Sequence, residues 1–193
     1  MAGSEPIRLI TLGHGTAGQD ELAALLREAE LDALVDVRTV PKSRRHPHVW
    51  REELERWVPA LTGVAYRWEP RLGGFRKPDP NSSNVALRHP AFRAYADAME
   101  KPPFQLALDE LLAQAAASRT AIMCSESLWW RCHRRLIADA AQLLHGTQVE
   151  HLMHDGTYRP HVPTAGVRVT DEGTLRYDVL FAGDEAGDPA AST

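Results

Sequence analysis

IRLITLGHGTAGQDELAALLREAELDALVDVR, residues 7–38, has the pattern of a strand, a helix and a second strand in direct succession. The apolar run IRLITLG ends at a glycine and is followed by turn-forming residues in positions 14–18. Leucines then recur at helical spacing, and LDALVDVR is again apolar with β-branched residues. Strands joined by a helix favour a parallel sheet with right-handed crossover connections.

The same alternation continues along the chain and predicts the remaining elements. We expect a helix in residues 50–61 that ends near Pro59, a strand in 64–70, helices in 89–100 and 104–118, and strands in 120–124 and 148–153. An apolar stripe predicts a helix from about Leu128, through Leu128, Cys132, Leu136, Ala140 and Leu144. Residues 166–181 are two alternating runs about an Asp-Glu-Gly turn, typical of a β-hairpin. The expected fold is α/β: one domain over residues 1–181, with a mostly parallel sheet flanked by helices and a C-terminal β-hairpin.

The composition fits one globular domain with a full core, since 44% of the 193 residues are hydrophobic and 25% are charged. Residues 182–193 are small and acidic, and we expect a disordered tail there. The N-terminus lacks a basic segment followed by an apolar run, and no stretch approaches the roughly 20 apolar residues that cross a bilayer. We therefore expect a cytoplasmic protein without membrane contact.

The charge distribution places any anion site in a local patch, because the net charge of the chain is −4. Arginine outnumbers lysine 19 to 3 and gathers in residues 38–48, 71–77 and 131–135. The planar guanidinium group matches two oxygens of a phosphate or carboxylate, so these clusters favour an anionic ligand. A genomic preference for arginine codons is the alternative explanation of the ratio.

Polar residues follow three predicted strands, and the carboxyl ends of parallel strands are where ligands bind in such sheets. Small residues there let backbone N–H groups approach an anion, next to the positive ends of helices. The candidates after the three strands are His14, Gly15 and Thr16; Asp36, Arg38 and Arg44; and Cys124, Ser125 and Glu126.

The two cysteines of the chain lie in or beside the third of these strand ends. Cys124 ends a strand just before a predicted helix, whose positive end lowers the pKa of a thiol and favours nucleophilic or ligating use. The alternative for Cys124 is a small buried residue that finishes a core strand. Cys132 lies on the predicted apolar stripe, which favours packing over a role as redox partner or metal ligand.

His133 and Glu126 are the titratable residues beside the cysteines. His133 could act as acid or base near neutral pH, or be a polar group satisfied by a neighbour. Glu126 could cap the helix, act as a base, or pair with Arg131 or Arg134. A structural zinc site needs four ligands at short paired spacings, whereas seven residues separate the two cysteines. Cys124, Cys132 and His133 are therefore only weak candidates for metal ligands, and the sequence implies no cofactor.

Five segments together resemble the domain of unknown function 488 family: LGHGT, LVDVRTVPKSRR, LGGFRKP, VALRHPAFRAYADAM, and IMCSES with WRCHRRLIADA. They cover most of residues 7–153 and leave the predicted hairpin outside. The resemblance implies an α/β fold but brings no settled activity, and family members often have Ala at the position of Ser125. It implies that these residues occupy the family's characteristic positions: His14, Asp36, Arg38, Pro41, Arg44, Gly73, Gly74, Arg76, Cys124, Glu126, Cys132, His133 and Arg134.

These observations favour a small enzyme that binds a phosphorylated or nucleotide-like ligand. In this hypothesis Cys124 is the nucleophile or a proton-transfer partner, and His133, His14 or Glu126 moves protons. The ligand-binding candidates are His14, Gly15, Thr16, Asp36, Arg38, Arg44, Gly73, Gly74, Arg76, Ser125 and Arg134. A second hypothesis is a non-catalytic nucleic-acid or nucleotide-binding module in which exposed Trp50, Trp68, Trp129 or Trp130 stacks on bases. A third is a metal or redox protein that uses both cysteines. The sequence sets no oligomeric state.

Overall fold

The computed structural model describes residues 6–180, and the predicted acidic tail lies outside them. Its main sheet has six strands in the order β3-β2-β4-β1-β5-β6. The strands are β1 (Arg8–Gly13), β2 (Ala33–Asp36), β3 (Ala65–Trp68), β4 (Thr120–Cys124), β5 (Gln148–Leu152) and β6 (Tyr158–Pro160). All pairings from β3 to β5 are parallel, and only β6 runs antiparallel to its neighbour. The predicted mostly parallel sheet is confirmed.

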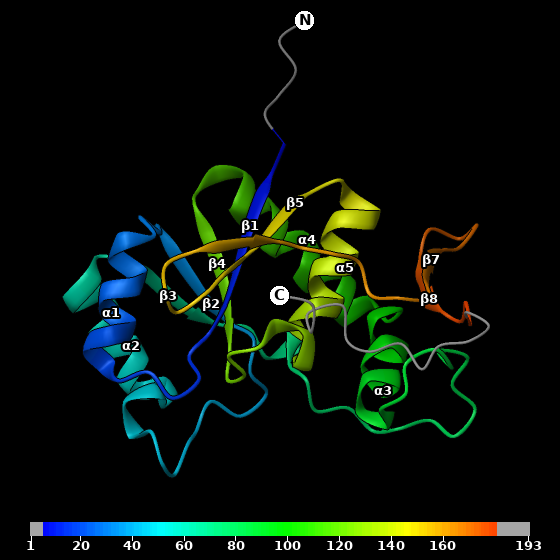
Figure 1. The fold of residues 1–193 in the computed structure, drawn as a ribbon, viewed down its shortest axis with the longest axis horizontal. Coiled ribbons are helices and arrows are strands. Elements are labelled where there is room, and N and C mark those ends of the chain that lie inside the picture. Colours follow the sequence, from blue (N-terminus) through cyan, green and yellow to red (C-terminus); the bar gives the residue numbers. More distant parts are fainter. Residues whose placement is uncertain (1–5, 181–193) are drawn as a thin grey trace, which may run out of the picture.

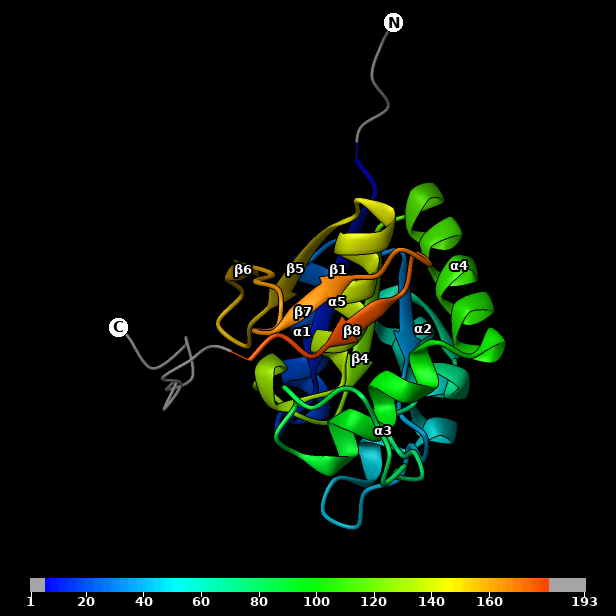
Figure 2. The ribbon, with the colours of Figure 1, turned by 90° about the vertical axis from the view of Figure 1, so that its right-hand side faces the viewer.

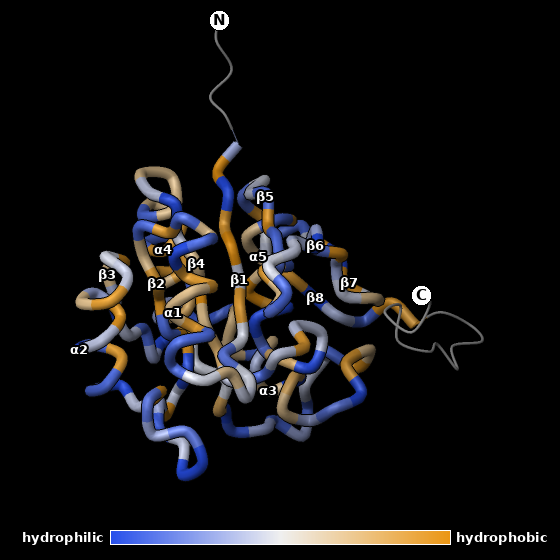
Figure 3. The backbone as a smooth tube through the Cα atoms, turned by 60° about the vertical axis from the view of Figure 1, so that its left-hand side comes forward, coloured by the Kyte–Doolittle hydropathy of each residue, from blue (hydrophilic) through white to orange (hydrophobic). Residues whose placement is uncertain are grey.

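Helices cover both faces of this sheet (Figure 1). One face packs on α1 (Gln19–Glu28) and α2 (Arg51–Thr62), and the other on α3 (Pro90–Met99), α4 (Pro102–Ala117) and α5 (Arg134–His145). Successive strand residues point to opposite faces, so Leu9 joins the core under α4 and α5 while Ile10 joins the core under α1. Figure 3 shows the hydrophobic residues concentrated along the central strands. Within the described residues, no helix combines the length and apolar character needed to span a bilayer.

The predicted C-terminal hairpin is confirmed as a separate two-stranded sheet, β7 (Val167–Val169) with β8 (Leu175–Tyr177). Figure 2 shows it lying across α5. Tyr177 anchors it, because this side chain is fully buried and its hydroxyl donates to Asp139 Oδ2 of α5 at 2.9 Å. The hairpin therefore closes the same side of the molecule as α3 and α5.

Two predicted helix boundaries are wrong. The helix expected from about Leu128 begins at Arg134; residues 129–131 form a single 3-10 turn, η3 (Trp129–Arg131), and Cys132 is extended. The extended backbone turns the Cys132 side chain toward the end of β4, which a continuous helix would not do. The helix expected to end near Pro59 continues to Thr62, and Gly63 in the left-handed conformation ends it.

The topology opens a crevice beside the carboxyl end of β4. The chain leaves β1 toward α1 on one face and leaves β4 toward α5 on the other. These strands are adjacent, with Gly13 opposite Cys124 in the ladder. A ligand site is expected where neighbouring strands send their connections to opposite faces, because the two loops separate there.

A buried hydrogen-bond chain ties β1, β5 and α5 together below this crevice. His161 Nε2 donates to Asp139 Oδ1 at 2.9 Å, which leaves its Nδ1 to accept from His151 Nε2 at 3.0 Å. His151 Nδ1 then accepts from the Thr11 hydroxyl at 2.7 Å, and the Trp129 ring stacks on the His151 ring at 4.1 Å. With both rings neutral, each of the four ring nitrogens of His151 and His161 has a hydrogen-bond partner.

This arrangement predicts that the folded state loses stability in acid. Burial, and then the nearby His161 and Arg134, lower the pKa of His151 to about 2. In the unfolded chain His151 titrates near pH 6.5, so stability is full above that pH and falls by about 1.4 kcal/mol per unit as the pH falls below it. Glutamine can accept from Thr11 and donate to His161. Urea unfolding should show that the free energy of unfolding of wild type falls more between pH 7.5 and pH 5 than that of His151→Gln. The expected difference between the two falls is about 2 kcal/mol. Equal losses would contradict the assignment.

Candidate functional site

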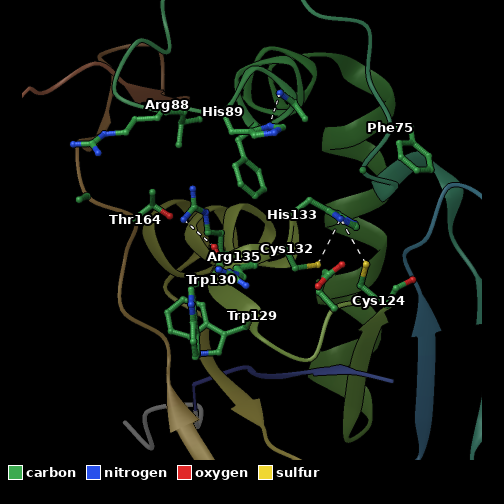
Figure 4. A pocket seen from close by; sticks show the side chains of 18 of the residues that line it. Phe75, Arg88, His89, Cys124, Trp129, Trp130, Cys132, His133, Arg135 and Thr164 are labelled. Atoms are coloured by element: carbon green, nitrogen blue, oxygen red, sulfur yellow. Dashed lines mark hydrogen bonds between the residues drawn. The ribbon is translucent and has the colours of Figure 1, made fainter. Parts of the chain in front are cut away.

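A cavity of about 1490 Å³ opens at the carboxyl end of β4. Its walls come from the loop after β2, the long loop before α3 with the first turn of that helix, the segment from β4 to α5, and residues 162–165 and 179–180 on either side of the hairpin. Figure 4 shows Cys124, Cys132 and His133 together on one side, with Arg88 and Thr164 across the cavity from them. The long loop and two of the three strand ends that the sequence singled out, those of β2 and β4, therefore border one space.

The two cysteines and His133 form a compact cluster in the floor of this cavity. Both sulfur atoms lie 3.7 Å from the same ring nitrogen, His133 Nδ1. Both cysteines are free thiols and are buried, with 7% of Cys124 and 3% of Cys132 exposed. All three residues line the cavity, so the cluster is reached from that side.

The His133 ring is fixed from two directions. Its Nε2 lies 3.0 Å from the Val37 carbonyl oxygen, which can only accept, so Nε2 carries a proton. In the neutral ring Nδ1 is then a lone pair aimed at the two sulfurs. Gly74 presses against the ring, and a Cβ at that position would lie only 2.7 Å from Nδ1. The loop before α3 therefore sets the orientation of His133.

The prediction that Cys124 has a lowered pKa is wrong. A hydrogen bond with Cys132, and then burial, raise the pKa of Cys124 well above its usual value. At Cys132 burial also acts to raise the pKa, but the hydrogen bond from Cys124, and then the interaction with His133, lower the pKa well below its usual value. Cys132 lies two residues before the first residue of α5, so the positive end of that helix also favours its thiolate. The thiolate of the pair therefore forms on Cys132, with Cys124 as hydrogen-bond donor.

Arg38 and Asp36 form a buried frame beside the cluster. The Arg38 guanidinium donates through Nε at 2.8 Å and Nη2 at 2.6 Å to the two Asp36 oxygens, and Nη2 also donates to Val49 O at 2.8 Å. Its Nη1 lies 3.3 Å from His14 Nε2. Burial, and then Arg38, lower the pKa of His14 to about 4, so His14 is neutral and accepts this bond. Because these donors are used internally, Arg38 positions the cavity wall, and His14 and Asp36 hold Arg38.

Arg134 holds the turn after β4. It is 1% exposed, and its Nη2 donates to the Glu126 carbonyl at 2.6 Å and to the Ser127 carbonyl at 3.3 Å. The turn packs so tightly on β1 that a Cβ at Gly13 would lie 1.8 Å from the Glu126 carbonyl oxygen. The Glu126 side chain is exposed and lines the cavity, and among the described residues it neither caps α5 nor pairs with an arginine.

Several sequence candidates lie outside the lining of the cavity. Thr16 and Arg44 are exposed on neighbouring loops. Gly15 approaches the turn after β4, where a Cβ would lie 2.0 Å from Ser127 Oγ. Gly73 packs on Thr39, and Arg76 donates to the Arg71 carbonyl at 2.5 Å. Of the glycine and serine candidates, Gly74 and Ser125 line the cavity.

Sequence reasoning missed much of the wall. Arg135 donates to the Trp130 carbonyl at 3.0 Å and lies over the Phe92 ring, 4.4 Å from its centroid. Phe75 is 76% exposed at the rim. Most of the missed residues belong to the five segments that resemble the family, and this membership was the signal that could have identified them. Residues 162–165 belong to none of these segments. Trp129 and Trp130, two of the tryptophans expected as stacking surfaces, do line the cavity. The missed lining residues with charged or aromatic side chains are Lys42, Phe75, Arg88, His89, Phe92, Arg131 and Arg135.

Comparison with known families places this geometry in context. The model of one family, described as Domain of unknown function DUF488, matches residues 19–141, which is more than half of the chain. The match includes β2, β4, both cysteines, His133 and most of α5. Comparisons with curated proteins and with solved structures found no match.

Proposed function

This chain belongs to the DUF488 family, and we propose that it is an enzyme that binds a phosphorylated or nucleotide-like ligand in the cavity. The reaction centre is the cluster of Cys124, Cys132 and His133. The observation that carries the proposal is the position of this cluster in the floor of a large cavity whose charged side chains are mostly basic. Perturbed titratable groups in a concave site are the usual mark of a reaction centre.

The charge of the lining supports an anionic ligand. Five basic side chains line the cavity, against the single carboxylate of Glu126. Four of the five side-chain N–H groups of Arg38 have partners within the protein, whereas Lys42 and Arg131 are exposed and form no salt bridge within residues 6–180. These two side chains are therefore available to hold a phosphate group, in a molecule whose net charge is −4.

The remaining wall supports a ligand with an aromatic or apolar part. Phe75, Phe92, Trp129 and Trp130 line the cavity together with aliphatic residues. Trp129 is held rigidly by its stacking on His151, with the two ring planes 7° apart. A base or similar ring can stack on such aromatic surfaces while the basic residues hold its anionic group.

The cluster supplies the chemistry at the floor. A thiolate in this pair can attack a ligand directly or hold a Lewis acid against it, and both uses place the reaction at the same point. His133 Nδ1 accepts a proton from the sulfur pair, and Glu126 is the carboxylate that faces the same space. His14, Asp36, Arg38 and Arg134 are positioning residues in this proposal.

Ligand binding should depend on the exposed basic residues of the lining. We expect a thermal-shift panel of phosphate, pyrophosphate and adenosine and guanosine phosphates to identify a stabilising compound. Lys42→Ala and Arg131→Ala should each weaken its affinity about 10-fold or more, because each removes a charge-assisted hydrogen bond worth roughly 1.5–3 kcal/mol.

Arg45→Ala is the matched control, since Arg45 is exposed on the same loop as Lys42 but does not line the cavity. Its affinity should equal that of wild type. Equal loss in Arg45→Ala and Lys42→Ala would mean a diffuse charge effect and would contradict a cavity site. A single-stranded oligonucleotide in the same panel tests the non-catalytic alternative, which predicts stabilisation by polymer and not by mononucleotides.

A further inference from the structure

The cluster has the geometry of a metal site as well as that of a thiol centre. The ligand atoms of Cys124, Cys132 and His133 all lie within 4.8 Å of one another. Tetrahedral zinc with bonds of about 2.3 Å to sulfur and about 2.0–2.1 Å to nitrogen has sulfur-to-nitrogen edges of about 3.6 Å. Both observed sulfur-to-nitrogen distances are 3.7 Å, so a zinc ion fits with little movement of the side chains.

His133 is held as ligating histidines are held. A histidine that binds metal through one ring nitrogen generally donates through the other to a carbonyl or carboxylate, which fixes the tautomer and the ring direction. His133 Nε2 donates to Val37 O, and Nδ1 faces the sulfurs. The contact with Gly74 prevents the ring from tilting away.

The number of ligands decides which kind of metal site this is. Structural zinc has four protein ligands, whereas catalytic zinc has three and keeps one position open, and two cysteines with one histidine form a known catalytic set. Because all three side chains line the cavity, the open position of such a site faces the cavity. Thiolate ligands also select soft and borderline metals over magnesium or calcium.

We propose that Cys124, Cys132 and His133 bind a zinc ion whose fourth coordination position opens into the cavity. The ion holds an oxygen of the anionic ligand or a water molecule in that position. Metal binding stands on the geometry of the three residues, whereas the role of the ion toward the ligand rests on the proposed function.

Cobalt(II) titration of the chelator-treated, fully reduced protein tests this directly. We expect one cobalt ion per chain, with the visible ligand-field bands of a tetrahedral site and near-ultraviolet sulfur-to-cobalt charge transfer. Protein purified without chelator should also contain zinc by elemental analysis. Zinc should protect both cysteines from alkylation, a readout that needs no substitution.

Substitutions then assign the ligands. Cys124→Ser, Cys132→Ser and His133→Asn should each weaken cobalt affinity by more than about 100-fold, since each removes a ligand. Circular dichroism identifies any variant that fails to fold, and the alkylation readout on wild type decides the question in that event.

Gly74→Ala provides a subtler prediction. Its Cβ would displace the His133 ring without removing a ligand, so cobalt affinity should fall about 10- to 100-fold, as when a group that orients a ligand is lost. Gly18→Ala is the matched control, because its Cβ would meet its nearest atom at 3.6 Å and the residue begins a helix remote from the cluster. It should bind cobalt as wild type does.

Two results would overturn the metal site: an octahedral cobalt spectrum without charge transfer, or unprotected thiols at saturating zinc. The nucleotide and phosphate panel distinguishes this failure from failure of the proposed function. Ligand stabilisation of the metal-free protein without metal binding overturns only the metal site. Tetrahedral cobalt binding without any ligand response supports the metal site and contradicts the proposed function.

Discussion

Replacing Asp36 with alanine is expected to lower the free energy of unfolding by about 3–5 kcal/mol, because it leaves a buried guanidinium group without its partner. Asp36 is fully buried and Arg38 is 4% exposed. The Asp36 carboxylate accepts two side-chain bonds from Arg38, one from the Arg38 backbone N–H at 3.0 Å and one from the Tyr66 hydroxyl at 2.8 Å. All of these donors lose their acceptor together, and equilibrium urea unfolding measures the loss.

The chain contains its own control for this experiment. Arg168 and Asp178 form an ion pair of the same two-bond geometry, with both distances 2.8 Å, but on the exposed hairpin. Asp178→Ala should cost about 1 kcal/mol or less, as is usual for exposed pairs. The double variant Asp36→Leu with Arg38→Met should recover much of the lost stability, since it leaves no unpaired charge. Equal effects of Asp36→Ala and Asp178→Ala would refute the positioning role of Arg38.

The sulfur cluster should dominate turnover. With the substrate that the ligand panel identifies, Cys124→Ser and Cys132→Ser should each lower kcat/KM by about 10⁴-fold or more, the scale found when one member of a catalytic unit is removed. The double variant should lose no more than the worse single variant, because residues that act as a unit are not additive. Losses that add would indicate two independent contributions and would contradict a single centre.

Serine preserves the size of each side chain, so the fold should survive these substitutions. Steady-state kinetics and the melting temperature are measured together, and the double variant contains no cysteine because the chain has only two. Unchanged turnover in folded Cys124→Ser and Cys132→Ser proteins would remove the cluster from the mechanism.

The fold followed from sequence because its signals are local. The apolar runs of β1, β2 and β4, and the helical spacing of α1, each depend on a few neighbouring residues. The hairpin likewise followed from alternation about a turn. The start of α5 did not, because the apolar spacing of residues 128–144 fits a helix that the tertiary structure interrupts at Cys132. Contacts of Cys132 with Cys124 and of Arg134 with the turn after β4 override the local preference.

The candidate site was predictable in its residue types but not in their roles. The sequence identified Cys124, Cys132 and His133 as candidates. The distance of 3.7 Å from each sulfur to His133 Nδ1 depends on Val37 and Gly74, which are distant in sequence and contact the His133 ring. Likewise, spacing alone could not tell that the Arg38 guanidinium faces inward to Asp36 while Lys42, four residues later, lines the cavity. Which of two thiols ionises also depends on their mutual hydrogen bond.

The central claim is that an anionic ligand binds in the cavity directly over the sulfur cluster. Its most direct test is the rate at which iodoacetamide alkylates Cys124 and Cys132 in the metal-free protein, followed by peptide mass spectrometry with and without the ligand from the thermal-shift panel. A ligand bound over the cluster should slow alkylation of both cysteines at the same concentrations that raise the melting temperature. Alkylation at an unchanged rate under saturating ligand would place the ligand elsewhere and contradict the account.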